Sequence, residues 1–74
     1  MTSALRQRLI HIAFTFGLFS RTATGYRCIL EDQRVLKLVN KYDQYGITHD
    51  LYEAYQEGQA KAQELYAKRC GFTV

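Results

Sequence analysis

The sequence predicts an all-α fold, a small bundle of three to four helices that forms one helical domain over residues 1–74. Three observations support this prediction. Apolar residues recur at helical spacing in separate stretches, residues that commonly cap helices stand between those stretches, and the chain contains no proline. With 47% hydrophobic residues, six tyrosines and four phenylalanines, the chain is too apolar for a disordered segment.

The first predicted helix begins at a cap formed by Thr2 or Ser3 and runs to about Phe16. Ile10 and Phe14 fall outside its main apolar stripe, on nearly the opposite side of the helix. Either the rest of the chain covers this helix on both faces, or its second face contacts a partner. The main stripe consists of Leu5, Leu9, Ile12, Ala13 and Phe16.

A turn and a second helix are expected next. Gly17 is suited to end the first helix in the left-handed conformation, and Ser20 is suited to cap a second helix that starts at Arg21. Gly25 costs about 1 kcal/mol relative to alanine inside a helix, so tertiary contacts or a close approach of another backbone must explain it. Asp32 can break this helix and cap a new one, although a helix continuous from Ser20 is the alternative.

The third predicted helix starts at Asp32 and ends at Gly46, which is expected to form a left-handed cap. Its spacing predicts one buried face. That stripe consists of Val35, Leu38, Val39, Tyr42 and Tyr45.

The last predicted helix starts at Thr48 or Asp50, runs to about Cys70 and ends at Gly71. Its apolar seam narrows at Gly58 and Ala62, where another helix could come very close. Packing on the chain's own core and contact with another chain both explain such a seam, and two heptads are too few to indicate a coiled coil. The seam consists of Leu51, Tyr55, Gly58, Ala62 and Leu65.

Nothing in the sequence has the pattern of a catalytic or metal site. The histidines and cysteines are far apart, without zinc-binding spacing, and no nucleophile is paired with a base. We therefore expect no enzymatic activity, no cofactor, no metal and no small-molecule substrate. Cys28 and Cys70 are expected to be reduced thiols in a cytoplasmic protein. The apolar run 9–19 is about half as long as a membrane-spanning helix, so no membrane association is predicted.

Size and charge indicate a protein that works with partners. A chain of 74 residues buries only about 60% of the surface that its unfolded form exposes, so pairing with a copy of itself or with a larger protein is expected. Residues 1–30 contain four arginines and no acid, a charge of +4, whereas residues 31–74 contain six basic and seven acidic residues, a charge of −1. The basic N-terminal half is the one suited to an anionic partner.

The order Ile12-Ala13, Phe16-Gly17-Leu18 and Ser20 resembles the turn of helix-turn-helix DNA-binding regulators, in which a small residue precedes a turn glycine and a hydroxyl residue opens the recognition helix. The resemblance implies a homodimeric transcription regulator that places the helix after Gly17 in duplex DNA. Arg6 and Arg8 would then steady the DNA backbone. The helix itself would contact DNA through Ser20, Arg21, Thr22, Thr24 and Arg27.

The alternative is a small helical protein-protein interaction module, either an accessory subunit or an inhibitor that docks on a larger protein, without DNA binding. Four tyrosines lie close to the turn at Gly46. Such a cluster suits either a partly solvated interface or the edge of a small core. Contiguous exposed area over Ile10, Phe14 and the tyrosines would favour this alternative. The predicted interface consists of Ile10, Phe14, Tyr52, Tyr55, Gly58 and Ala62.

Overall fold

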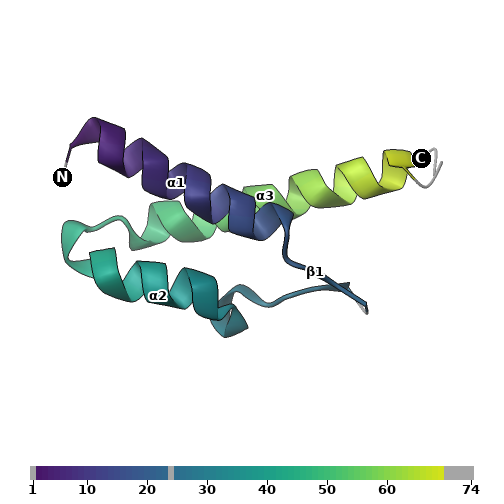
Figure 1. Ribbon diagram of the computed structural model, residues 1–74, viewed down its shortest axis with the longest axis horizontal. Coiled ribbons are helices and arrows are strands. Elements are labelled where there is room, and N and C mark those ends of the chain that lie inside the picture. Colours follow the sequence, from purple (N-terminus) through teal and green to yellow (C-terminus); the bar gives the residue numbers. More distant parts are fainter. Residues whose placement is uncertain (1, 24, 70–74) are drawn as a thin grey trace.

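The computed structural model of the protein describes residues 2–23 and 25–69. Within them the chain forms three α-helices, a two-stranded antiparallel sheet and two short 3-10 helices (Figure 1). The all-α prediction is therefore confirmed in its coarse form, since the structure is mostly helical. The elements are α1 (Ser3–Leu18), β1 (Arg21–Thr22), β2 (Gly25–Tyr26), η1 (Ile29–Glu31), α2 (Gln33–Tyr42), η2 (Asp43–Tyr45) and α3 (Thr48–Arg69).

The first helix begins as predicted and ends differently. The Thr2 side chain accepts a hydrogen bond from the Leu5 backbone N–H at 3.2 Å and caps α1. The prediction that Gly17 terminates the helix in the left-handed conformation is wrong. Gly17 lies inside α1, and the described glycines with positive φ are Gly25 and Gly46.

Gly17 serves a close helix crossing. A Cβ on Gly17 would overlap the Tyr55 carbonyl oxygen and lie 2.9 Å from its carbonyl carbon, and a Cβ on Gly58 would lie 2.8 Å from the Leu18 backbone nitrogen. The two glycines thus let the backbones of α1 and α3 meet. This crossing accounts for the narrow seam predicted at Gly58, where the chain's own α1 is the neighbour.

The prediction of a helix that starts after Ser20 is wrong. The predicted helix-turn-helix arrangement, which needs that helix, is therefore wrong as well. The chain forms a hairpin in which Arg21 pairs with Tyr26 and Thr22 with Gly25. Gly25 has a φ of 152°, a conformation that costs glycine little. β-Branched threonine suits a strand better than a helix, so the residues that weakened the predicted helix favour the hairpin.

The remaining helix starts follow the sequence pattern, but the third helix ends earlier than predicted: α2 stops at Tyr42, and η2 continues the chain to Gly46. The Asp32 side chain accepts from the Arg34 backbone N–H at 3.1 Å and caps α2, so the chain breaks at Asp32. Gly46, with a φ of 68°, is the predicted left-handed residue. Helix α3 starts at Thr48, and the predicted stop at Gly71 lies outside the described residues.

The core lies where α2 and the N-terminal half of α3 meet α1. Ile10, Phe14 and Tyr52 are half-buried and pack against it, so the rest of the chain partly covers this second face of α1. Within the described residues no helix combines the length and apolarity needed to cross a membrane. The buried core side chains are Leu9, Ala13, Val35, Val39, Ile47, Leu51, Ala54 and Tyr55.

Candidate interaction surface

Three of the exposed large apolar side chains lie together beside the C-terminal part of α3. Phe19, directly after α1, is 69% exposed, while Leu65 and Tyr66 near the end of α3 are 46% and 38% exposed. They border a shallow groove of about 340 Å³, which we call the α3 groove. It is lined by Leu18, Phe19, Arg21, Ala62, Leu65 and Tyr66.

The groove exists because α3 extends beyond the end of α1. Helix α1 ends at Leu18, directly after the crossing with Gly58, whereas α3 continues to Arg69 (Figure 1). At a rise of about 1.5 Å per residue, residues 59–69 extend α3 by roughly 16 Å past the crossing. Ala62, Leu65 and Tyr66 are three and four positions apart and share one helix face. The apolar seam thus continues past the point where α1 covers it.

Arg21 forms the polar part of the groove. Its guanidinium Cζ lies 3.3 Å from the centroid of the Tyr66 ring, a cation–π stack between β1 and α3. The side chain stays exposed, and no carboxylate of the described residues forms a salt bridge with it. Lys61 differs, because its amine lies 3.8 Å from the Glu64 carboxylate.

A hydrogen-bonded cluster fixes the hairpin against α3. The Gln59 amide donates to the Ser20 hydroxyl at 3.1 Å and to the Arg27 carbonyl oxygen at 2.7 Å, and the Ser20 hydroxyl donates to the Gly17 carbonyl oxygen at 2.6 Å. The Arg27 N–H also donates to the Ser20 carbonyl oxygen at 2.8 Å. The Gln59 side chain of α3 thus binds both ends of the hairpin. In this position, Arg21 on β1 lies against the Tyr66 ring.

An ion pair between the buried Asp32 carboxylate and the half-exposed Arg34 fixes the start of α2 beside this cluster. The fully buried Asp32 carboxylate accepts from Arg34 Nε at 3.0 Å, from Arg34 Nη2 at 2.8 Å and from the Tyr55 hydroxyl at 2.7 Å. The hydrogen bonds from Arg34 lower the pKa of the Asp32 carboxyl to about 2, against the effect of burial. Burial and the neighbouring Asp32 carboxylate raise the pKa of Tyr55. Every buried polar side-chain atom among the described residues has a hydrogen-bond partner, so this cluster has a structural role.

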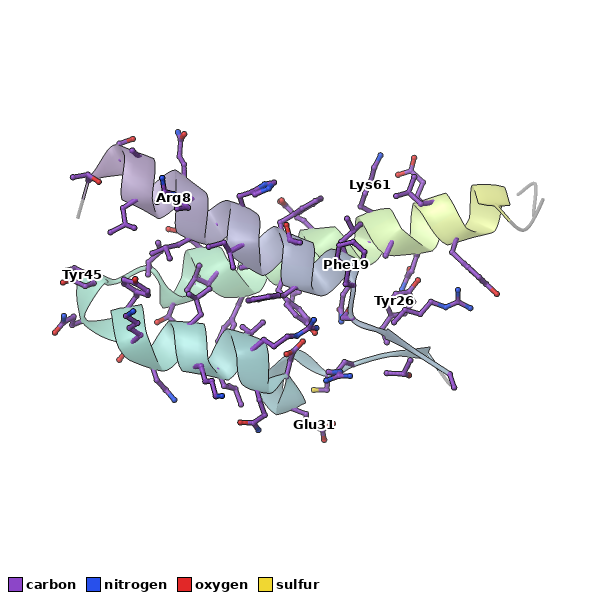
Figure 2. All side chains as sticks on the ribbon, viewed as in Figure 1. Arg8, Phe19, Tyr26, Glu31, Tyr45 and Lys61 are labelled. Carbon is purple, nitrogen blue, oxygen red and sulfur yellow. The ribbon has the colours of Figure 1, made fainter. Side chains whose placement is uncertain are left out.

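The residues predicted to bind DNA do not form one surface. Ser20 is buried inside the hairpin cluster, Arg6 is paired with Asp50, and Thr24 lies outside the described residues. Arg21, Arg8 and Arg27 are exposed and Thr22 is half-buried. Figure 2 shows Arg8 on the N-terminal half of α1, whereas the hairpin follows the other end of that helix.

The predicted interface lies mostly in the core. Tyr55 and Gly58 are buried, and Ile10, Phe14 and Tyr52 pack on the core cluster. Ala62 lines the α3 groove. The predicted interface did not include Phe19, Leu65 or Tyr66, although Leu65 belongs to the predicted seam of the last helix. The sequence did contain a signal for them: the apolar face of the last predicted helix is longer than the first helix, so the first helix cannot cover all of it.

The four tyrosines around Gly46 differ in how far they are exposed to solvent. Tyr55 is buried, Tyr42 and Tyr52 are half-buried, and Tyr45 is 51% exposed. The rings of Tyr42 and Tyr45 lie 6.2 Å apart. Figure 2 places Tyr45 at one end of the molecule and Phe19 near its middle, and Tyr45 does not line the α3 groove, so the two are separate features.

The chain matches no family model, no curated protein and no solved structure. Its function is therefore inferred from the geometry of its own surface.

Proposed function

We propose that the protein is a small protein-interaction module that binds a short segment of a larger protein in the α3 groove. The observation that carries this proposal is the exposure of Phe19, directly after α1, together with Leu65 and Tyr66 on the part of α3 that extends past α1, where all three line one groove. Clustered apolar side chains of this kind, bordered by polar groups, are typical of protein-binding surfaces. The core is formed without them, so folding does not explain their position.

The size of the surface indicates a short segment as the partner. The exposed parts of these three side chains amount to roughly 300 Å², since an aromatic side chain offers about 150–250 Å². At ~25 cal/mol/Å², covering this area contributes several kcal/mol before the cost of association. A stable interface between two globular proteins needs about 800 Å² from each partner. A peptide-like segment fits the smaller area.

Duplex DNA binding is the other function that the sequence predicts. Its support was an outward helix beginning at Ser20, and that segment is a hairpin. Arg8 lies on the N-terminal half of α1, whereas the hairpin that contains Arg21 follows the other end of that helix. For this reason we place DNA binding second and include it in the test.

The test is a selection of peptides from a displayed random library, followed by titration of labelled peptides against the protein and its variants. Leu65→Asp is expected to weaken the selected peptides more than tenfold, because it places a charge on the apolar wall of the groove. Leu30→Asp is the matched control, since Leu30 is 65% exposed and lies outside the groove. Circular dichroism should show the same helix content in both variants.

Two results would overturn the proposal. In the first, the selection yields no peptide, or only peptides that bind Leu65→Asp as well as the natural protein. In the second, a labelled DNA duplex at low salt binds, binding survives Leu65→Asp, and it is lost when Arg21 and Arg27 are both replaced by alanine. The second result would favour DNA as the partner.

A further inference from the structure

We infer that the α3 groove selects a partner segment in which an aspartate or glutamate stands beside the apolar anchor, and that Arg21 determines this specificity. The inference rests on the proposed function of the groove and adds the chemistry of its partner. It is carried by the placement of one stacked guanidinium, Arg21, among the mostly apolar residues that line the described groove.

The stack leaves Arg21 ready to accept a carboxylate. Tyr66 lies against the flat face of the guanidinium, 3.3 Å from Cζ to the ring centroid, so the N–H groups at its edge remain available. Stacking and the anchored hairpin also restrict the side chain, which reduces the entropy lost on binding. Planar guanidinium donors match the two oxygens of a carboxylate.

The protein contains a completed example of the same arrangement. The Arg34 Cζ lies 5.0 Å from the centroid of the Phe16 ring, and its Nε and Nη2 both donate to the Asp32 carboxylate. Arg21 has the aromatic ring and lacks a carboxylate partner among the described residues. An acidic side chain from another protein would complete the arrangement on the surface.

Charge and area argue against a second copy of this chain as the occupant. A two-fold contact through the groove would bring Arg21 of one copy toward Arg21 of the other, and like charges at an interface are unfavourable. The groove also offers far less area than a stable dimer needs.

A single-stranded nucleic acid is a poorer fit than a peptide. Such ligands need several cations along the backbone and open aromatic faces for the bases. Here Arg21 covers one face of Tyr66, and Glu64 lies beside Lys61.

The experiment compares peptide pools selected by the natural protein and by Arg21→Glu from one displayed random library. The natural protein should enrich aspartate or glutamate next to an aromatic residue or leucine. Arg21→Glu should enrich lysine or arginine at the same position, because the charge of the groove is reversed. A selected acidic peptide then enters a double-mutant cycle with its carboxylate replaced by the amide and with Arg21→Gln.

Each single change is expected to weaken binding by about tenfold, and the second change should add little once the first is made. Additive losses, or pools rich in apolar residues without an acid preference, would overturn the inference and leave the proposed function standing. Selected peptides that bind Leu65→Asp unchanged would overturn both. Tighter binding of a labelled oligothymidine than of any selected peptide would also overturn the inference and identify a nucleic-acid surface.

Discussion

Replacement of Gly58 by alanine tests the crossing on which this fold depends. In an exposed helix this change stabilises by about 1 kcal/mol, because alanine has the higher helix propensity. In this structure the added Cβ would lie 2.8 Å from the Leu18 backbone nitrogen and 3.1 Å from the Gly17 carbonyl carbon. Those atoms belong to the backbone of α1, so relief requires the whole helix to move away from α3.

The expected net effect is destabilisation. Forcing a methyl group into a packed site costs typically about 1–3 kcal/mol, and an obstacle made of backbone belongs at the upper end of that range. After the gain in propensity, the free energy of unfolding should fall by about 2 kcal/mol. For a domain of this size, that loss lowers the Tm by roughly 8–16 °C.

Urea and thermal unfolding followed by far-UV circular dichroism measure this effect. Ala60→Gly is the control, because Ala60 is exposed on the same helix and reports propensity alone, a loss of about 1 kcal/mol. Gly17→Ala should resemble Gly58→Ala, and the double variant should lose less than the sum, because the first change already separates the helices. A Tm that stays the same or rises in Gly58→Ala would refute the close crossing.

Two further predictions concern the buried carboxylate. Tyr55→Phe should lower the free energy of unfolding by about 1–3 kcal/mol in urea titrations, because Asp32 loses a buried donor, and an unchanged unfolding midpoint would contradict this role. Asp32 has a pKa of about 2 in the folded protein against an ordinary value of 3.8, so its contribution of about 2 kcal/mol is present above pH 4 and lost as pH falls toward 2. Asp32→Asn should be less stable at neutral pH and lack this part of the acid dependence; equal acid dependence in both proteins would show that Asp32 has no depressed pKa.

Local patterns allowed the helical parts of the fold to be predicted. Thr2, Asp32 and Gly46 act as the caps that their residue types favour, and the stripe through Val35 and Val39 faces the core. Each of these features depends on residues within a turn or two of the helix. Interactions of such short range are visible in the sequence.

The hairpin could not be predicted in the same way, because distant residues decide it. A serine after a helix can open the next helix or bond back to the last turn, and Ser20 does the latter. Gln59 holds it there from α3. In the same manner, Gly17 was suited to a cap, and only the position of Gly58 on another helix makes it a crossing residue.

Stability and binding should be separable in this protein because the crossing divides α3 into two parts. The part before Gly58 contributes Leu51, Ala54 and Tyr55 to the core, and the part after it carries Leu65 and Tyr66 at the surface. Gln59 lies at the division and holds the hairpin that brings Arg21 to the groove. Changes at Leu65 should therefore alter recognition with little effect on unfolding, whereas changes at Gly58 should alter unfolding first. A groove residue whose replacement unfolds the chain would show that this end of α3 belongs to the core.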